Sequence, residues 1–122
     1  MKNAINWFEI PVENFDRAKK FYETVIGAEM SPMEMEGVKS AFFPADNQNG
    51  IGGCIIKADG YVPSEKGVLV YLNGGDDLAV PLSRVAKAGG KVVLPKTSIG
   101  QHGFMAYFID SEGNRIAFHS RK

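Results

Sequence analysis

Two side chains in this sequence combine the chemistry and the setting that acid–base catalysis requires. Glu9 lies in the middle of an alternating segment, on the face opposite Phe8 and Ile10. If that face lines a partly apolar cavity, the carboxylate could serve as a general base. His119 alternates with Phe118 and could be its partner acid or, with Glu9, supply two metal ligands. The alternatives are a Glu9 that pairs with a basic side chain at the rim and a His119 that is a surface histidine.

Two further reactive side chains lie next to glycines. His102 lies in a loop between Gly100 and Gly103, where it could close over a ligand or simply be solvated. Cys54 is the only cysteine, so it cannot form an internal disulfide. It would be a nucleophile only if a neighbouring base lowered its pKa. No base lies near it in the sequence, so we expect a buried, unreactive thiol.

The other candidates are apolar or aromatic side chains with a hydroxyl and an amide as polar handles, which suits a pocket for a small, partly apolar molecule. These predicted ligand-binding residues are Trp7, Leu69, Tyr71, Asn73, His102, Tyr107 and Ala117, with Phe43 as a further possibility. The alternative for all of them is ordinary core packing.

The first half of the chain has the pattern of a strand, a helix and three strands. Apolar residues recur at helical spacing from Phe15 to Ile26, Asn14 is a good N-cap, and Gly27 is a stop signal. Alternation and turn signals predict strands at 5–12, 29–35, 38–44 and 51–57. The polar stretch 58–66 has the composition of a linker.

The second half repeats this order. The segment 68–73 alternates like the first strand, and an apolar stripe from Leu78 to Ala88 predicts the matching helix. Leu78 follows Phe15 by 63 residues, and the same offset carries Gly27 onto Gly90, as expected for a duplicated unit. Three more strands are predicted at 91–94, 104–109 and 115–119.

The start of the second helix is left open by the sequence. Asp76 or Asp77 can cap it, but Pro81 would remove an early backbone hydrogen bond if the helix began at Leu78. A start nearer Val80 is equally consistent with the pattern.

Composition excludes several classes of partner. Fourteen basic and fourteen acidic residues give a formal net charge of zero, and no run of Lys or Arg is present to follow phosphates. We therefore expect no nucleic-acid partner. The beginning of the sequence, MKNAINWFEI, has no apolar run of membrane-spanning or signal length, so we expect a cytoplasmic protein without a membrane partner.

The segments FEIPVENFDRAKKFYETVIG and FMAYFIDSEGNRIAF, at their separation in this chain, resemble those of the vicinal oxygen chelate superfamily. That superfamily contains glyoxalase I, bleomycin-resistance proteins, fosfomycin-resistance thiol transferases and extradiol dioxygenases. The resemblance covers essentially the whole chain. It implies an α+β fold in which two βαβββ modules form a cup-shaped, partly open mixed sheet with the helices outside. It also implies one domain over 1–122 (module 1 about 1–57, linker 58–66, module 2 about 67–122), a binding site on the concave face, and a homodimer.

The resemblance also identifies four strand positions at which metalloenzymes of the family carry His, Gln or Glu ligands. In this chain they are Trp7, Gly53 or Cys54, Leu69 and Ala117. Trp, Leu and Ala cannot ligate a divalent cation. We therefore predict no metal at the usual place and no cofactor, although a divalent metal with displaced ligands such as Glu9 and His119 stays an alternative.

Two functions follow as hypotheses. The first is a metal-free protein of the bleomycin-resistance kind that binds a small, partly apolar molecule in a concave cavity. The second is an enzyme, which would be either a metal-dependent lyase, isomerase or dioxygenase with displaced ligands, or a metal-free acid–base catalyst that uses Glu9 and His119. A glyoxalase reaction is disfavoured, because a metal ion there stabilises an enediolate and Glu9 alone cannot replace it.

Overall fold

Each half of the chain forms one β-α-β-β-β module, in the order that the sequence predicts. The structure is a computed structural model and describes residues 2–122. Module 1 consists of β1 (Trp7–Pro11), α1 (Phe15–Ile26), β2 (Ser31–Met35), β3 (Val38–Phe42) and β4 (Gly52–Lys57). Module 2 consists of β5 (Val70–Asn73), α2 (Ala79–Leu82), α3 (Val85–Ala88), β6 (Lys91–Ser98), the short 3-10 helix η1 (Gly100–His102), β7 (Phe104–Ile109) and β8 (Arg115–Ser120).

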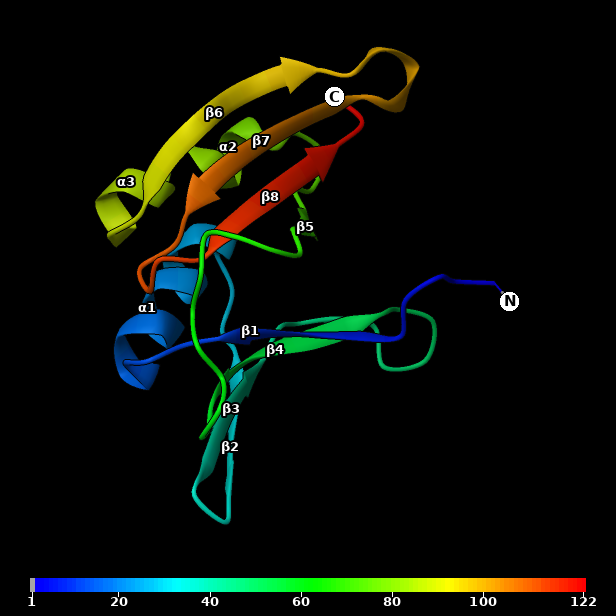
Figure 1. Cartoon of the computed structure of the whole chain (residues 1–122). Coiled ribbons are helices and arrows are strands. Elements are labelled where there is room, and N and C mark those ends of the chain that lie inside the picture. The colour runs from blue at the N-terminus through cyan, green and yellow to red at the C-terminus, as the bar shows by residue number, and fades with distance from the viewer. Residues whose placement is uncertain (1) are drawn as a thin grey trace.

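The strands form two separate four-stranded mixed sheets. Sheet 1 has the order β1-β4-β3-β2 and sheet 2 the order β5-β8-β7-β6. In each sheet the first strand pairs in parallel with the last, and the other neighbours are antiparallel. The edges β1 and β5 lie toward one another (Figure 1), but they share no hydrogen-bonded ladder, so the sheets do not close. The predicted α+β class with two βαβββ modules is confirmed.

Helix α1 begins and ends where the sequence predicts. The Asn14 side chain accepts a hydrogen bond from the Arg17 N–H at 3.0 Å, which satisfies one of the free donors of the first turn. Gly27 ends the helix in the left-handed conformation at φ 72°, and its N–H donates to the Glu23 carbonyl. These local signals suffice because both caps depend only on residues next to the helix.

The second predicted helix is two short helices instead of one. Pro81 lies inside α2 and has no N–H to donate, and the Ser83 hydroxyl donates to the Val80 carbonyl at 2.7 Å. The missing N–H of Pro81 falls in the first turn, where it has no intrahelical acceptor, whereas the Ser83 hydroxyl competes for a carbonyl, and the helix is interrupted between Leu82 and Val85. The N-cap of α2 is Leu78, which neither predicted cap matches, although the Asp77 carboxylate just before it accepts the Ala79 N–H at 2.9 Å.

Strand β6 is twice as long as the predicted segment, since it continues past Leu94 to Ser98. Its pairing with β7 shifts register between Val92 and Leu94 and again between Leu94 and Thr97. Pro95 cannot donate to the ladder, and bulges of this kind let an edge strand pass such a residue. The proline therefore marks an irregularity and does not end the strand.

One hydrophobic core is shared by the two modules, with α1 as the common element. The Phe21 ring lies 6.1 Å from the Phe108 ring of sheet 2, and the Tyr22 ring lies 5.3 Å from Phe43 beside sheet 1. Each sheet thus has an inner face against the helices and an outer face turned away from them. Among the described residues, no helix has the length and apolarity needed to cross a membrane.

Candidate functional site

The outer face of sheet 2 carries most of the predicted site residues, arranged in three rows across the strands. The rows follow from the alternation of each strand and from the pairing register of β5, β8, β7 and β6. Between them they contain a cationic pair, a tyrosine pair and a histidine. The rows are Lys91–Ile109–Arg115, then Leu94–Tyr107–Ala117–Tyr71, then Thr97–Met105–His119–Asn73.

Two tyrosines occupy the middle row. The hydroxyl oxygens of Tyr71 and Tyr107 lie 3.3 Å apart, and the rings meet edge to face with centroids 6.3 Å apart. The hydrogen bond to Tyr107, followed by partial burial, raises the pKa of Tyr71. Ala117 lies between the two tyrosines in the ladder and is fully buried. The predicted ligand-binding Ala117 is therefore covered, while Tyr71 and Tyr107 present hydroxyls at this point of the face.

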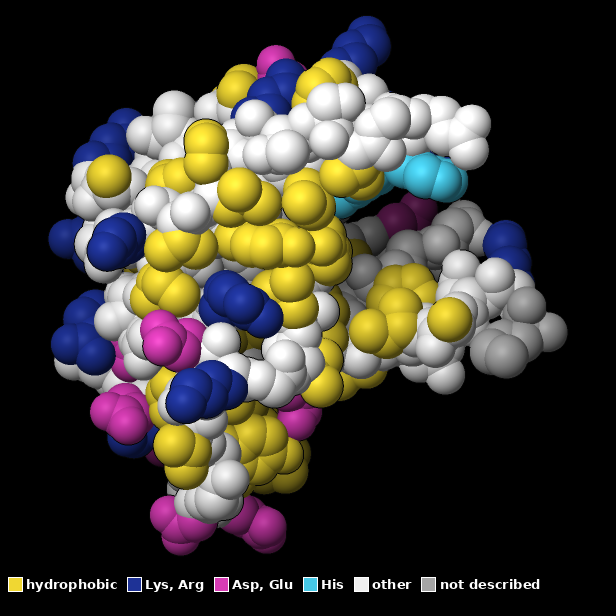
Figure 2. All heavy atoms as spheres, turned by 45° about the horizontal axis from the view of Figure 1, so that its top comes forward, with side chains coloured by type: hydrophobic (Ala, Val, Ile, Leu, Met, Phe, Trp, Pro, Cys, Tyr) yellow, Lys and Arg dark blue, Asp and Glu magenta, His cyan; other side chains and the backbone are white. Residues whose placement is uncertain are grey.

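His119 is held by the loop that contains His102. The His119 Nε2 lies 2.7 Å from the His102 carbonyl oxygen. A carbonyl can only accept, so Nε2 is the donor in this contact. The His102 side chain itself is exposed on η1. In Figure 2 the histidine side chains border a hollow on one side of the molecule.

The outer face of sheet 1 carries Glu9, Cys54 and Trp7. Glu9 is exposed, is paired with Cys54 across the ladder, and accepts a hydrogen bond from the Tyr61 hydroxyl at 3.0 Å. Cys54 is 2% exposed. Burial and then the nearby Glu9 charge raise the pKa of Cys54 to about 11. The thiol is thus protonated at neutral pH, in agreement with the expected unreactive cysteine.

The two predicted catalytic residues have separate partners. Glu9 is on sheet 1 and bonds Tyr61 of the linker, whereas His119 is on sheet 2 and bonds the His102 carbonyl. Within residues 2–122 the two side chains form no ion pair with one another. The same residues contain no group of three or more His, Cys, Asp or Glu side chains placed to share a metal ion.

The strand pairing decides which residue occupies the one position, Gly53 or Cys54, that the resemblance leaves open among the four metal-ligand positions. In module 1, the residue two positions after Trp7 is Glu9, and it pairs with Cys54. In module 2, the residue two positions after Leu69 is Tyr71, and it pairs with Ala117. Cys54 rather than Gly53 is thus the equivalent of Ala117. These four side chains offer one ligating atom, a buried thiol with a raised pKa, and do not fit a divalent cation.

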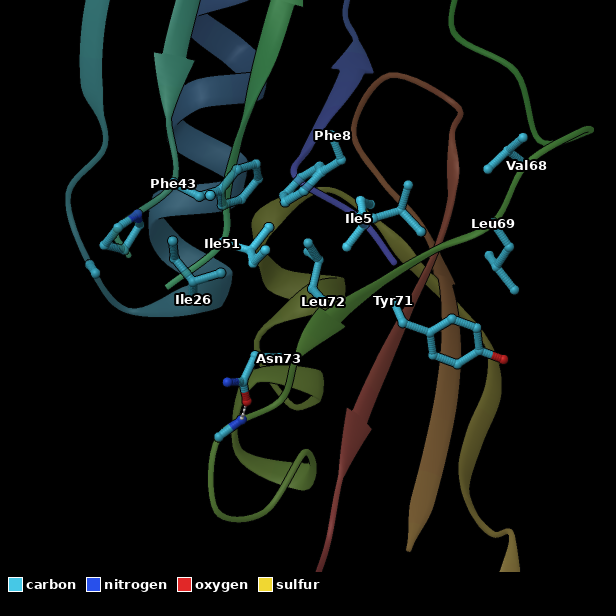
Figure 3. A pocket seen from close by; sticks show the side chains of 15 residues that line it. Ile5, Phe8, Ile26, Phe43, Ile51, Val68, Leu69, Tyr71, Leu72 and Asn73 are labelled. Carbon is cyan, nitrogen blue, oxygen red and sulfur yellow. Dashed lines mark hydrogen bonds between the residues drawn. The ribbon is translucent and has the colours of Figure 1, made fainter. Parts of the chain in front are cut away.

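A cavity of about 690 Å³ lies at the seam between the two modules; we call it the seam cavity. Its lining comes from both sides of the seam: Ile5, Phe8, Ile26, Ala28, Phe43, Pro44, Ile51 and Gly52 of module 1, and Val68, Leu69, Val70, Tyr71, Leu72, Asn73 and Gly75 of the linker end and module 2. Figure 3 shows Phe8, Phe43, Ile51 and Leu72 grouped around a shared space, whereas Tyr71 points away from it. The cavity is therefore apolar in its interior, with Tyr71 at its margin.

The predicted ligand-binding residues divide between the seam cavity and its surroundings. Leu69, Tyr71 and Asn73 line it, as does Phe43, and the Asn73 amide oxygen accepts the Gly75 N–H at 2.8 Å. Trp7, His102, Tyr107 and Ala117 are not part of the lining. Sequence reasoning missed most of the aliphatic lining, because alternation in a strand shows which residues are apolar but not whether they meet a partner. Phe8, Ile51 and Leu72 have the pattern of core residues.

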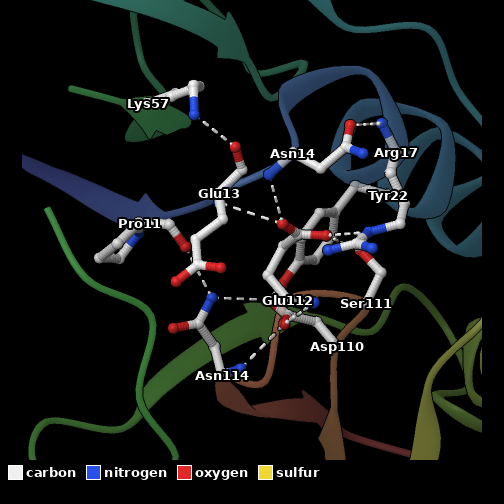
Figure 4. Close-up of polar contacts among 10 residues, drawn as sticks. All are labelled: Pro11, Glu13, Asn14, Arg17, Tyr22, Lys57, Asp110, Ser111, Glu112 and Asn114. Atoms are coloured by element: carbon white, nitrogen blue, oxygen red, sulfur yellow. Dashed lines mark hydrogen bonds and ion pairs between the residues drawn. The ribbon is translucent and has the colours of Figure 1, made fainter.

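A network of hydrogen bonds, which we call the polar junction, joins the modules at another place (Figure 4), and three of its bonds to Asp110 are buried. The Asp110 carboxylate accepts hydrogen bonds from the Tyr22 hydroxyl at 2.5 Å, from the Asn114 side chain at 3.0 Å and from the N–H groups of Glu112 and Asn114, both at 2.9 Å. Asn114 also donates to the Pro11 carbonyl at 2.8 Å. Burial, followed by the charge of Asp110 and the hydrogen bond to it, raises the pKa of Tyr22 well above its ordinary value.

In the second half of the polar junction, Glu112 of module 2 caps helix α1 of module 1. The Glu112 carboxylate accepts the N–H groups of Glu13 and Asn14 at 3.0 and 2.7 Å, and the Arg17 Nε at 2.7 Å. Burial acts to raise the pKa of Glu112, but hydrogen bonds from Arg17, Asn14, Ser111 and Glu13 outweigh it and lower the pKa. A carboxylate of module 2 thus sits at the positive end of the helix of module 1.

Comparisons with known proteins agree on one family. Residues 4–118 match the family model described as the glyoxalase/bleomycin resistance protein/dioxygenase superfamily. A glyoxylase-like domain-containing protein of Didymella fabae is 30% identical over 129 residues, covering 99% of this chain and 96% of that protein.

Solved structures share the fold at low sequence identity. A glyoxalase/bleomycin resistance protein from Albidiferax ferrireducens T118 superimposes with a TM-score of 0.76 at 14% identity, covering 98% of this chain and 100% of that one. A family enzyme from Burkholderia phytofirmans PsJN gives 0.69 at 12% identity, with 96% and 98% covered. A glyoxalase I variant from Zea mays gives 0.68 at 18% identity, covering 94% of this chain and 45% of that one.

Proposed function

The chain belongs to the glyoxalase/bleomycin resistance protein/dioxygenase superfamily, and on that premise we propose that it binds a small, partly apolar molecule in the seam cavity without using a metal ion. The observation that carries the proposal is the lining of this cavity. It is apolar, comes from both modules, and encloses about 690 Å³, which is within the ~300–1,000 Å³ typical of small-molecule sites.

The same lining favours binding over catalysis. Among the described residues that line the seam cavity there is no Asp, Glu, His, Cys, Lys or Arg. A ligand inside would be held by apolar burial, worth roughly 25 cal/mol per Å² of apolar surface removed from water. The Asn73 amide at the margin would supply orientation. Neither Glu9 nor His119 is part of this lining, so no acid–base pair faces the ligand.

A titration with N-phenyl-1-naphthylamine, an uncharged apolar dye, tests the proposal. We expect the dye to bind with enhanced emission and to change the fluorescence of Trp7. Trp7 is the only tryptophan, and its ring lies against Gly52, since a Cβ there would be 3.3 Å from it. Ile51→Trp places a large ring among the lining side chains and should weaken dye binding about tenfold or more.

The matched control is Val62→Trp, which adds the same ring at a 71% exposed position of the linker outside the seam cavity. Equal dye affinity in the two variants would overturn the site. Elemental analysis of untagged, dialysed protein tests the metal-free part of the proposal. We expect well under one equivalent of any transition metal, and a stoichiometric metal would contradict it.

A further inference from the structure

We propose that Lys66, Lys91 and Arg115 form a binding site for the oxyanion group, phosphate or carboxylate, of a small organic molecule. The three side chains line a depression of about 620 Å³ at one end of the outer face of sheet 2, which we call the cationic pocket. The rest of its lining is Glu65, Val93 and Ile109. This site is separate from the seam cavity, with which it shares no lining residue.

The sheet register brings two of the cations together. Lys91 of β6 and Arg115 of β8 both pair with Ile109 of β7, so they flank it in one row across the strands. Lys66 comes from the segment between the modules and completes the lining. Three cations face one carboxylate, Glu65, which leaves the cationic pocket with an excess of positive charge that suits an anion.

Arg115 has an unused donor at this point. Its Nε is buried and has no hydrogen-bond partner among the described residues. Buried donors are nearly always paired, so an orphaned guanidinium nitrogen calls for a partner. Arginine favours oxyanions because its planar fork can donate two hydrogen bonds to one of them, so an oxyanion in the cationic pocket would give this guanidinium a partner. The guanidinium carbon lies 5.8 Å from the Tyr107 ring centroid, which orients the fork.

Three other cations of the chain are neutralised by ion pairs. Arg17, Lys19 and Lys96 form ion pairs with carboxylates at 2.7, 3.1 and 2.9 Å. Within residues 2–122, none of the three cations of the cationic pocket is in such a pair. The apolar surface of Val93 and Ile109 beside them indicates a ligand with a short apolar part as well as an oxyanion.

Arginine side-chain NMR tests the proposal directly. The Nε–Hε signals of isotopically labelled protein are followed during titration with inorganic phosphate and, separately, with acetate, against sodium chloride at matched ionic strength. We expect the Arg115 signal to shift saturably with at least one oxyanion while the exposed Arg121 does not. Tighter saturation by phosphate or by acetate identifies which oxyanion the site prefers.

Variants provide the controls. Lys91→Gln and Lys66→Gln should each weaken oxyanion binding about threefold to tenfold, because each removes one charge-assisted contact. Lys87→Gln, a change of the same kind on α3, should not. Both test positions are exposed, so these variants are expected to fold, and their melting curves check it. A shift of Arg115 that does not saturate, matches that with chloride, or is unchanged in both variants would overturn the site. Dye binding in the seam cavity is unaffected by either result.

Discussion

The two modules meet at the polar junction and at the seam cavity, and the two contacts are built on opposite principles. At the polar junction the Asp110 and Glu112 carboxylates each accept four hydrogen bonds, from both modules or from their own turn. At the seam cavity, apolar side chains of both modules face one another without filling the space.

The difference shows how the cavity can persist. Apolar burial is non-directional and by itself favours closer approach of the two modules. Hydrogen bonds have defined lengths and directions, so a satisfied network fixes the relative position of the parts that it joins. We infer that the polar junction sets the spacing of the modules and so preserves a preformed cavity, which costs a ligand little reorganisation.

Asp110→Ala should have the largest effect on this arrangement. It leaves the Tyr22 hydroxyl, the Asn114 amide and two backbone N–H groups without their acceptor in a buried setting. We expect a loss of about 3–5 kcal/mol in the free energy of unfolding, measured by urea denaturation. Dye binding in the seam cavity should weaken as well. A stable variant with unchanged dye affinity would contradict the inference that the polar junction preserves the seam cavity.

Tyr22→Phe should have an intermediate effect. It removes one hydroxyl from a fully buried ring and leaves the Asp110 carboxylate short of one donor, at an expected cost of about 1–3 kcal/mol. Tyr61→Phe is the matched control, because its hydroxyl also donates to a carboxylate, Glu9, but in an exposed setting. We expect that change to cost less than about 0.5 kcal/mol. Similar losses in the two variants would show that burial is not what makes the polar junction strong.

We also predict a contact between two copies of the chain, which would form a homodimer. The outer face of sheet 1 and its edge strand β2 present Trp7, Met33 and Met35 at 46%, 44% and 61% exposure. Light scattering with size exclusion should give a dimer mass, and Met35→Lys should weaken the dimer about tenfold. The same substitution at Val80, 53% exposed on α2, is the control. A monomer mass for the unmodified protein at micromolar concentration would contradict this prediction.

The parts of the fold that the sequence predicted are those with local causes. Helix α1 follows from Asn14 and Gly27, which act on adjacent backbone groups. The division of the second helix and the length of β6 were missed, because Pro81 and Pro95 permit either continuation or a stop and tertiary pairing decides between them.

The candidate site likewise has features that the sequence predicts and features that depend on tertiary pairing. Leu69 and Tyr71, which the sequence predicts as ligand-binding residues from their type and strand position, line the seam cavity. The sequence could not show that Tyr107 meets Tyr71 above Ala117, because that contact depends on the register of three strands that are not all adjacent in sequence. The seam cavity was not predictable either, since its lining comes from two modules whose sheets share no ladder.

The smallest expected effect is the pH dependence that Glu112 contributes. Its pKa is lower in the folded chain than its ordinary value of 4.5. It therefore stabilises the fold above about pH 4.5, and this contribution is lost as the pH falls through the lower folded value. Glu112→Gln should remove that part of the acid destabilisation, about 1 kcal/mol or less because Arg17 is exposed. Urea midpoints of both proteins between pH 3 and 7 measure it, and parallel curves would show that Glu112 acts as a neutral cap.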